Sequence, residues 1–367
     1  MLERFLRLAA DEPDAAALIT DNNTITRAQL LAAAQAINAR FTAAGLREGD
    51  LVGVQLPNSV GFVAAFLAAL ERKLVMVAID RDATETEVGR ILSHFAVKGF
   101  LWSGCELTTR VLSEHPAIPP EARLVKTTSG STGAPKGIVA SAENLLADCL
   151  NICATMGIRP DDVNFGAIPF SHSYGFSNLV TPLIVQGTAV VISNEYLPHS
   201  ILALCNRHRC TVAPLIPMVY EHLTTVDGSF DTVRTFLSAG APLAPAVSRR
   251  FRERFGREIH SFYGCSECGG ITYDRRGGAV ERGTVGSALE NVSLSLAGGR
   301  LVVRSAAVAL GYLHDARTFA PFDAFVSDDL AQIDDDGEVS LIGRASELIN
   351  TAGRKVNPRE VEQVILQ

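Results

Sequence analysis

An eleven-residue stretch in the first half of the chain has the composition expected of a loop that binds a polyphosphate. It covers residues 127–137 and reads Thr-Thr-Ser-Gly-Ser-Thr-Gly-Ala-Pro-Lys-Gly. Hydroxyl and backbone N–H groups can donate to phosphate oxygens, glycine lets the backbone approach them, and a lysine can neutralise their charge. The usual P-loop ends in Gly-Lys-Ser/Thr, whereas here Pro135 precedes Lys136 and Gly137 follows it. We therefore predict a phosphate loop of another kind, because a surface linker would not explain a lysine fixed between proline and glycine.

A second group of chemically suited side chains occupies residues 261–267, Ser-Phe-Tyr-Gly-Cys-Ser-Glu. The Tyr263 ring could stack on an adenine, the Ser266 hydroxyl could donate to a phosphate, and the Glu267 carboxylate could ligate Mg²⁺. Residues 235–243 predict a strand that runs into a turn of small residues, against which a flat ring could lie. A simple strand-to-helix loop explains that turn equally well.

Two further candidates stand apart from these stretches. His172 lies in Phe-Ser-His-Ser-Tyr-Gly, and its spacing alone favours a structural hydrogen-bonding role over a catalytic one. Asp329 follows Asp328 in a segment whose simplest interpretation is an acidic surface turn. The run Asp-Asp-Asp-Gly at 334–337 is likewise predicted to be a surface turn.

Taken in order over nearly the whole chain, these stretches resemble the adenylate-forming superfamily of acyl- and aryl-CoA synthetases, luciferases and adenylation domains of peptide synthetases. Residues 127–137 resemble its phosphate loop, 235–243 one wall of its adenine site, and 343–362 its hinge and the start of its small domain. The resemblance implies that a substrate carboxylate attacks the α-phosphate of ATP, which gives acyl-AMP and pyrophosphate. It also implies Mg²⁺ as cofactor and transfer of the acyl group to the thiol of CoA or of a carrier protein's phosphopantetheine.

The resemblance also implies roles for single residues. Lys136 and the loop hydroxyls would hold the β- and γ-phosphates, Glu267 would hold magnesium, and His172 would guide the substrate carboxylate. Asp329 would bind the ribose hydroxyls, and Arg344 would reach the ribose or a phosphate. The residues expected to bind ATP or AMP are Thr128, Ser129, Gly130, Ser131, Thr132, Gly133, Lys136, Gly240, Ala241, Pro242, Tyr263, Gly264, Ser266, Asp329 and Arg344. The residues expected to be catalytic are His172, Glu267 and Lys136, and those expected to line the acyl pocket are His172, Phe176, Met218, Gly240, Cys265 and Gly269.

The same resemblance narrows the substrate class. Amino-acid-activating relatives place an aspartate near the position of His172 to hold the substrate ammonium, and no acid occurs between Pro169 and Gly187. We therefore expect a carboxylic acid without an α-amino group, either an aryl or a fatty acid. An amino-acid adenylation domain remains an alternative, but it would need a buried acid in the pocket. A non-catalytic nucleotide-binding module is another alternative, and it would bind AMP without pyrophosphate exchange.

Several positions depart from the family pattern. Arg300 stands where relatives usually have glutamate, and we expect it to be structural. Asp328 replaces the glycine of the family's Thr-Gly-Asp turn, and Ser346 takes the hinge position that is commonly Asp or Lys. Cys265 and Cys268 form a single C-x-x-C, which we interpret as incidental because a zinc site needs more ligands.

Length and composition limit the remaining function classes. With 367 residues and 47% hydrophobic content, the chain can bury a large core and should divide into more than one structural unit. A net charge of −7 argues against a nucleic-acid surface. No apolar run reaches the length of a membrane span, and residues 1–7 do not resemble a secretory signal. The seven cysteines cannot all pair, so we expect a soluble protein of the reducing cytoplasm, whose oligomeric state is open.

The pattern of apolar residues predicts an α/β fold. A capping box at Thr26–Gln29 starts a helix that runs to Gly45, and strands at 51–56 and 75–79 flank a helix at 59–70. This alternation implies a parallel sheet covered by helices. Together with the resemblance, it predicts two βα lobes in five αβαβα layers, plus a small β-rich subdomain.

The expected domain limits follow the same order. A large domain covers 1–345, with lobes at about 1–123 and 124–280 and the β-rich subdomain at about 281–345. Residues 346–367 match the hinge and the start of a small domain. No residue matches the late lysine of the family's small domain, so we expect a shortened form of a longer enzyme with impaired turnover. A natural stand-alone binding domain is the other interpretation.

Overall fold

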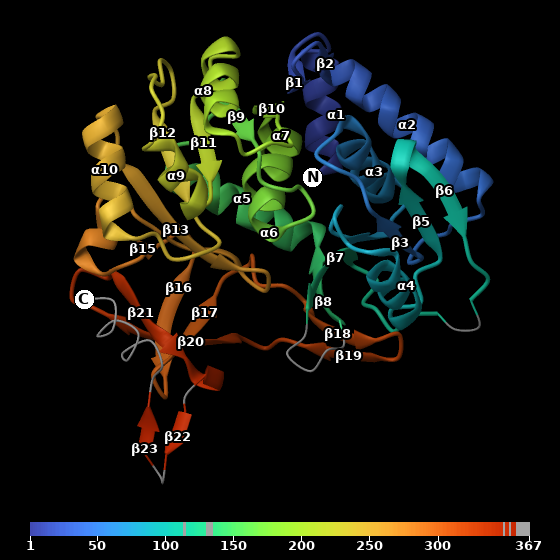
Figure 1. Cartoon of the computed structure of the whole chain (residues 1–367). Coiled ribbons are helices and arrows are strands. Elements are labelled where there is room, and N and C mark those ends of the chain that lie inside the picture. The colour runs from blue at the N-terminus through green and yellow to red at the C-terminus, as the bar shows by residue number, and fades with distance from the viewer. Residues whose placement is uncertain (113–114, 130–134, 348, 352–353, 357–367) are drawn as a thin grey trace.

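The computed structural model describes residues 1–112, 115–129, 135–347, 349–351 and 354–356 (Figure 1). Four of the expected phosphate-loop residues, Gly130, Ser131, Thr132 and Gly133, lie outside the described residues. Much of the expected start of the small domain, residues 357–367, also lies outside them.

An eight-stranded sheet forms the half of the molecule on the right of Figure 1. Its order is β19-β18-β8-β7-β4-β3-β5-β6, and the neighbours among β3, β4, β5 and β7 are parallel. Its strands are β3 (Leu51–Val54), β4 (Val75–Ala78), β5 (Gly99–Trp102), β6 (Glu106–Thr109), β7 (Ala122–Ser129), β8 (Pro135–Ser141), β18 (Gly311–Asp315) and β19 (Thr318–Pro321). The expected phosphate loop therefore connects two antiparallel neighbours, β7 and β8.

A nine-stranded sheet forms the other half, in the order β15-β14-β13-β12-β11-β9-β10-β1-β2. Its interior neighbours from β13 to β1 are parallel, and its two edges are antiparallel. Its strands are β1 (Ala16–Ile19), β2 (Thr24–Thr26), β9 (Val163–Gly166), β10 (Ala189–Ile192), β11 (Val212–Leu215), β12 (Thr235–Ser238), β13 (Ile259–Cys265), β14 (Gly269–Tyr273) and β15 (Ser287–Ala288).

The two sheets do not divide the sequence at residue 123, where a lobe limit was expected. Strands β1 and β2 come first in the chain, yet β1 pairs with β10 in the nine-stranded sheet. Strand β8 and most of β7 follow residue 123, yet they belong to the eight-stranded sheet, as do β18 and β19.

Helices form three layers that alternate with the two sheets, which confirms the expected αβαβα arrangement. Alternate residues of β4 point to opposite faces: Val75 and Val77 pack with α4, and Met76 and Ala78 pack with α3. The middle layer holds α1, α2, α3 and α7, and helices α8, α9 and α10 cover the outer face of the nine-stranded sheet. The helices are α1 (Leu2–Asp11), α2 (Arg27–Ala43), α3 (Val60–Glu71), α4 (Glu85–His94), α5 (Ala142–Met156), α6 (Ser173–Gly175), α7 (Thr181–Gln186), α8 (Pro198–Arg207), α9 (Pro217–Leu223) and α10 (Pro245–Phe255).

Local sequence signals account for several helix starts. Thr26 caps α2 and exchanges hydrogen bonds with Gln29, so the predicted capping box is confirmed. Ser59 and Ser141 cap α3 and α5 by accepting a backbone N–H bond in the first turn. Helix α1 and the β1–β2 hairpin were not predicted from the sequence.

A four-stranded antiparallel sheet, β16-β17-β20-β21, forms the β-rich part below the nine-stranded sheet in Figure 1. Its strands are β16 (Ser293–Ala297), β17 (Arg300–Arg304), β20 (Phe325–Ile333) and β21 (Val339–Arg344), and the hairpin β22 (Ile349–Thr351)–β23 (Arg354–Val356) follows. Arg300 Nε donates to the Ser327 carbonyl at 2.7 Å, so it has the structural contact expected of it.

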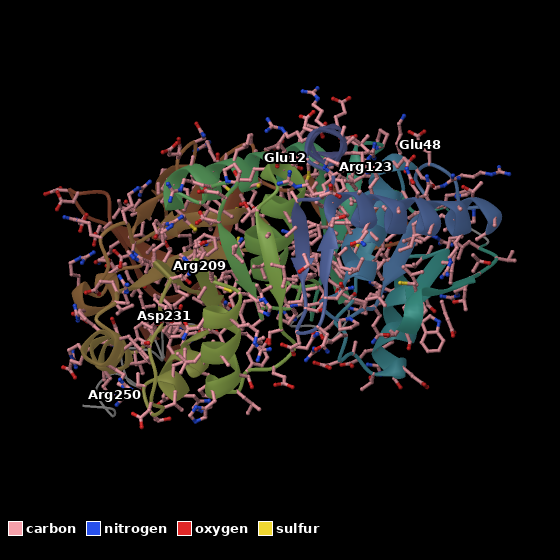
Figure 2. The ribbon with its side chains drawn as sticks, turned by 90° about the horizontal axis from the view of Figure 1, so that it is seen from above. Glu12, Glu48, Arg123, Arg209, Asp231 and Arg250 are labelled. Atoms are coloured by element: carbon pink, nitrogen blue, oxygen red, sulfur yellow. The ribbon has the colours of Figure 1, made fainter. Side chains whose placement is uncertain are left out.

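Figure 2 shows the two halves side by side from above, with charged side chains such as Glu48 on one half and Arg250 on the other. Within the described part of the chain, no helix is both long and apolar enough to cross a membrane. All seven cysteines are free thiols.

Candidate active site

A cavity of about 190 Å³ opens where β12 and β13 end, and we call it the central pocket. Helix α6 and the turns after β12 and β13 supply most of its walls. Four of the six residues expected to form the acyl pocket line it, namely His172, Gly240, Cys265 and Gly269. The other lining residues are Ser173, Tyr174, Ser177, Ala239, Phe262, Gly264 and Ser266.

The remaining two expected pocket residues lie elsewhere. Phe176 is 1% exposed and packs edge-on against Phe66 of α3, at a ring-centroid distance of 4.9 Å, in the layer between the sheets. Met218 lies in the first turn of α9 and is 51% exposed. Neither side chain lines the central pocket, because one points into the interlayer core and the other into solvent.

A second cavity of about 470 Å³, the loop cavity, lies beside the ends of β7 and β8. Thr127, Thr128 and Pro135 line it at the two flanks of the expected phosphate loop. His172 lines both cavities and therefore forms part of the wall between them. The other lining residues are Asp80, Asp82, Ala83, Glu87, Arg90 and Ile91.

A carboxylate holds the His172 ring. His172 Nε2 lies 2.6 Å from Asp80 Oδ2, and both side chains are partly exposed. Partial burial favours the neutral acid, but the Asp82 backbone N–H and the His172 ring outweigh it and hold the pKa of Asp80 below its usual value. The other ring nitrogen of His172 is left for a group in the site.

A tyrosine joins the expected phosphate-binding lysine to the expected magnesium ligand. The Lys136 ammonium lies 4.3 Å from the centroid of the Tyr312 ring, within cation–π range. The Tyr312 hydroxyl donates to Glu267 Oε1 at 2.7 Å. Burial, together with this hydrogen bond, raises the pKa of Tyr312. Tyr312 was not predicted as a site residue.

The expected adenine and ribose residues also meet. The Tyr263 hydroxyl donates to Asp329 Oδ2 at 2.6 Å, and Arg344 Nε donates to Asp329 Oδ1 at 3.3 Å. Burial, followed by the Asp329 carboxylate, raises the pKa of Tyr263. Beside this group, the Ser346 hydroxyl donates to Asp328, which ties the expected hinge residue to the same turn.

Small residues bring the backbone segments of the site together. Gly264 faces Gly269 so closely that an added Cβ would lie 2.3 Å from the Gly269 carbonyl oxygen. Gly240 has a φ of +86° in the exposed turn that also contains Ala241 and Pro242. Ser173 Oγ donates to Ser266 Oγ at 2.7 Å, which links α6 to the turn after β13.

Two buried charged residues near the central pocket, Asp148 and Lys126, were missed by the sequence analysis, as was the lining residue Ser177. Asp148 of α5 is 3% exposed, and its two oxygens accept from Ser177 Oγ at 2.5 Å and from the Gly270 backbone N–H at 2.8 Å. Lys126 of β7 is 5% exposed, and Asp148 is the strongest charge acting on it. Burial raises the pKa of Asp148 and lowers that of Lys126.

No acid of the described residues lines the central pocket, but a buried acid, Asp148, lies directly behind its wall. Asp148 comes from α5, outside the segment 169–187 in which an acid was sought, and it packs against Ser177 and Gly269 of the pocket wall. A sequence signal existed. Asp148 lies between Leu145 and Ile152 on the apolar face of α5, a position where an ionisable side chain is rarely placed without a reason.

The fold and the site together define the class of adenylate-forming enzymes. A family model described as "AMP-binding enzyme" matches residues 5–127 and 108–313. These matches cover most of the sequence, and the chain belongs to this family, which is the superfamily indicated by its motifs.

Curated relatives in this family include acid–CoA ligases. The 4-coumarate–CoA ligase-like 9 of Oryza sativa subsp. japonica is 28% identical over 400 residues, which span 89% of this chain and 72% of that protein. The feruloyl-CoA synthase of an Amycolatopsis species is 25% identical over 398 residues, which span 97% of this chain and 81% of that protein.

Solved structures show the same fold. The o-succinylbenzoate CoA synthetase of Bacillus subtilis, in complex with its acyl-adenylate intermediate, superposes with a TM-score of 0.87 at 21% identity, over 99% of this chain and 82% of that one. The N-terminal domain of FACL13 from Mycobacterium tuberculosis superposes with a TM-score of 0.82 at 20% identity, over 94% of this chain and 99% of that one.

Proposed function

We propose that this protein activates an aryl or aliphatic carboxylic acid without an α-amino group by forming its acyl-AMP from ATP. The observation that carries the proposal is the convergence of side chains from distant parts of the sequence around strand β13. Tyr312 joins Lys136 to Glu267, and Tyr263 joins β13 to Asp329. A nucleotide bound along this line would meet a cation for its phosphates at one end and an acid for its ribose at the other.

Lys136 is suited to the phosphate chain. Its ammonium rests on the Tyr312 ring and forms no ion pair with a carboxylate of the described residues. Its N–H donors therefore remain available for phosphate oxygens. Their negative charge increases as the α-phosphorus bonds to the substrate carboxylate and the bond to the leaving pyrophosphate breaks.

Glu267 is suited to a magnesium ion. Its Oε1 accepts the Tyr312 hydrogen bond, whereas its Oε2 accepts none from the described residues. A carboxylate oxygen with a free lone pair is the ligand that Mg²⁺ prefers when phosphates complete its coordination. A bound magnesium ion would withdraw charge from the phosphates.

His172 is suited to guide the substrate carboxylate, because it lines both the central pocket and the loop cavity. An acid in the central pocket would present its carboxylate at this wall, next to Ser266. Asp80 fixes the orientation of the His172 ring, so the enzyme would not need to order the ring in the transition state. In a second step, the thiol sulfur of CoA or of a carrier protein would attack the acyl carbon, and AMP would leave.

The buried Asp148 favours a second candidate, an amino-acid adenylation enzyme. A carboxylate behind the central pocket could attract a substrate ammonium. However, Lys126 opposes this attraction, because the two buried charges nearly cancel at a distance. We therefore rank this candidate below the acid without an amino group.

Pyrophosphate exchange into ATP tests the proposal directly. The protein is incubated with ATP, Mg²⁺, labelled pyrophosphate and, one at a time, aryl, fatty and amino acids. We expect exchange that depends on an aryl or fatty acid.

Exchange that depends only on amino acids would establish the second candidate. Binding of AMP without any acid-dependent exchange would identify a nucleotide-binding module and overturn the proposal.

A further inference from the structure

Beside the central pocket lies a group of polar and charged residues that the proposed reaction does not use. We call Lys126, Asp148 and Ser177 the floor subsite. Helix α5 packs against β7, against the π-helix Phe176–Val180 and against β14, so it brings together side chains from three separate segments. Ser177 and Gly269 line the pocket, and Asp148 contacts both of them from behind. Lys126, on the facing strand β7, lies close enough for Asp148 to be the strongest charge acting on it.

The Asp148 carboxylate is fixed in place by two hydrogen bonds and by close packing against Gly269. Each of its oxygens accepts one hydrogen bond, from Ser177 Oγ or from the Gly270 N–H. Gly269 leaves room for the carboxylate, since a Cβ there would lie 2.2 Å from Asp148 Oδ1. Carboxylate oxygens can each accept a second hydrogen bond, so Asp148 keeps acceptor capacity.

Lys126 is buried without a direct ion pair. No described carboxylate forms a salt bridge with its ammonium, and no described residue accepts a hydrogen bond from it. Burying an ammonium costs several kcal/mol unless hydrogen bonds replace its water, so an ammonium at 5% exposure would gain from an acceptor on a bound molecule. Leu124, two residues earlier on the same face of β7, packs in the apolar layer between the sheets.

Ser177 presents only an acceptor to the pocket. Its proton is given to Asp148, so the lone pairs of Oγ are what a bound molecule would meet. The remaining wall at this end consists largely of the apolar side chains of Tyr174, Phe262 and Ala239. A ligand group that donates to Ser177 or Asp148 and accepts from Lys126 would satisfy every member of the subsite.

We propose that the floor subsite recognises a neutral hydroxyl group at the end of the substrate acid remote from the reacting carboxylate, an inference that rests on the proposed function. If the remote group were a second carboxylate, Lys126 would attract it but Asp148 would repel it. If it were an ammonium, Asp148 would attract it but Lys126 would repel it. A methyl group would leave the buried polar atoms unpaired, which costs more than the lost contact itself. The pocket volume of about 190 Å³ limits the acid to one ring or a short chain.

The experiment compares substrates that differ only in the remote group. On the aryl or aliphatic skeleton that best supports pyrophosphate exchange, hydroxyl, methyl, carboxylate and aminomethyl derivatives are assayed at each ring or chain position. On a benzoate skeleton, for example, these are para-hydroxybenzoate, para-methylbenzoate, terephthalate and para-aminomethylbenzoate, with their meta isomers. We expect kcat/KM for the best hydroxyl derivative to exceed that for its methyl analogue by about ten- to a hundredfold.

Variants assign this preference to the subsite. Lys126→Met and Asp148→Asn should each reduce the hydroxyl-to-methyl ratio to within about threefold of unity. Because either single change leaves one buried charge uncompensated, the double variant K126M/D148N removes both charges at nearly constant volume and should keep the fold. It should retain exchange with the methyl analogue and lose the preference for hydroxyl.

Lys98→Met is the matched control. Lys98 forms a closed pair with Asp50 at 2.6 Å in the same half of the molecule, away from both cavities. This variant should lower the melting temperature and leave the hydroxyl-to-methyl ratio unchanged.

The outcomes separate the two proposals. Exchange without a hydroxyl preference, or with a preference that survives in K126M/D148N, would reject the floor subsite alone. A preference for carboxylate or for ammonium would also reject it, in favour of a diacid or an amino acid. No exchange with any acid would reject the proposed function and the subsite with it.

Discussion

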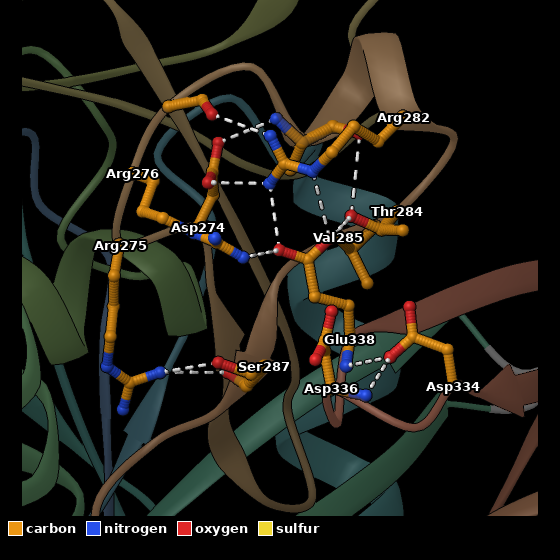
Figure 3. Close-up of polar contacts among 12 residues, drawn as sticks. Asp274, Arg275, Arg276, Arg282, Thr284, Val285, Ser287, Asp334, Asp336 and Glu338 are labelled. Carbon is orange, nitrogen blue, oxygen red and sulfur yellow. Dashed lines mark hydrogen bonds and ion pairs between the residues drawn. The ribbon is translucent and has the colours of Figure 1, made fainter.

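Two of the regions that contain buried charges satisfy them to very different degrees. In the first region, Glu338 at the start of β21 meets Arg282, Arg276 and Thr284 (Figure 3). Arg282 Nη2 donates to Glu338 Oε1 at 2.8 Å and Arg282 Nε to Oε2 at 3.1 Å, while Thr284 Oγ1 adds a bond of 2.7 Å. Arg282 also reaches Asp274, at 3.4 Å. We call these five residues the Glu338 cluster.

The second region is the floor subsite. Lys126 and Asp148 are at least as deeply buried as Glu338, yet they form no salt bridge, and the donors of Lys126 meet no acceptor among the described residues. A cluster whose donors and acceptors are all paired has none available for a ligand, whereas a cluster with unpaired donors can bind one.

The location of each region agrees with this difference. The Glu338 cluster joins the small antiparallel sheet to the edge of the nine-stranded sheet, so its pairing fixes one part of the fold against another. The floor subsite borders a pocket. In this comparison the paired charges of the Glu338 cluster join two parts of the fold, and the charges of the floor subsite lie beside the proposed site. The following variants test this difference.

The largest effect is expected at Lys136, another ammonium without an ion pair among the described residues. Lys136→Ala should reduce pyrophosphate exchange by about a hundred- to a thousandfold, because a charge that stabilises the transition state is lost. It should weaken ATP much more than AMP, measured by calorimetry, since AMP lacks the β- and γ-phosphates.

Lys73→Ala is its matched control. Lys73 forms an exposed pair with Glu48 at 3.4 Å, and its loss should change neither exchange nor nucleotide binding. Equal losses of ATP and AMP affinity in Lys136→Ala would contradict the phosphate assignment.

The next effect is on stability alone. Glu338→Gln should lower the free energy of unfolding by about 2–3 kcal/mol, because it leaves the partly buried Arg282 and Thr284 without their charged acceptor. Melting followed by circular dichroism should show the midpoint about 3–6 °C lower.

Glu221→Gln is the control, since Glu221 and Arg250 form an exposed pair at 3.8 Å that should contribute little. If Glu338→Gln lost much of its pyrophosphate exchange at a temperature where it is still folded, the Glu338 cluster would not have a purely structural role.

The Glu338 cluster also predicts that the stability of the fold decreases at acidic pH. Hydrogen bonds from Arg282, acting against partial burial, lower the pKa of Glu338 from 4.5 to about 2. Between these values the unfolded chain binds a proton that the folded chain does not, so this stabilisation is complete above pH 4.5 and is lost as the pH falls towards 2. The melting difference between the wild type and Glu338→Gln should shrink over this range. A difference that stays constant from pH 6 to pH 3 would show that the carboxylate charge is not its source.

The contrast between regions also explains how far the sequence could predict this molecule. The expected phosphate loop at 127–137 and the motif at 261–267 are each an unbroken stretch of sequence. Each can therefore be recognised from a few adjacent residues. Tyr263 of the second motif and Arg344 both donate hydrogen bonds to Asp329, so three residues expected to bind the nucleotide lie together. Helix starts at Thr26 and Ser59 were predicted because capping is local.

What could not be predicted depends on packing between distant segments. Lys126 and Asp148 belong to different elements, and only the docking of α5 on β7 brings them near each other. Tyr312 reaches Glu267 because β18 pairs with β8, and this long-range pairing cannot be predicted from any local sequence pattern. Met218 failed as a pocket residue for the converse reason, since apolar character does not determine which way a side chain on α9 points.

The smallest effect is expected at Asp80, where function is proposed but the pair is exposed. Asp80→Asn keeps a hydrogen-bonding group beside His172 Nε2 and removes its charge, so the ring should be held less firmly. We expect kcat/KM for the acid to fall by about two- to fivefold, with ATP affinity unchanged. The melting temperature should move by less than about one degree, because exposed pairs contribute under about 1 kcal/mol. Asp82→Asn, which alters a neighbouring exposed acid of the loop cavity, is the control and should leave the rate for the acid unchanged. If Asp80→Asn weakened the binding of ATP instead of lowering kcat/KM for the acid, His172 would contact the nucleotide. The assignment of the acid to the central pocket and of the phosphates to the loop cavity would then have to be reversed.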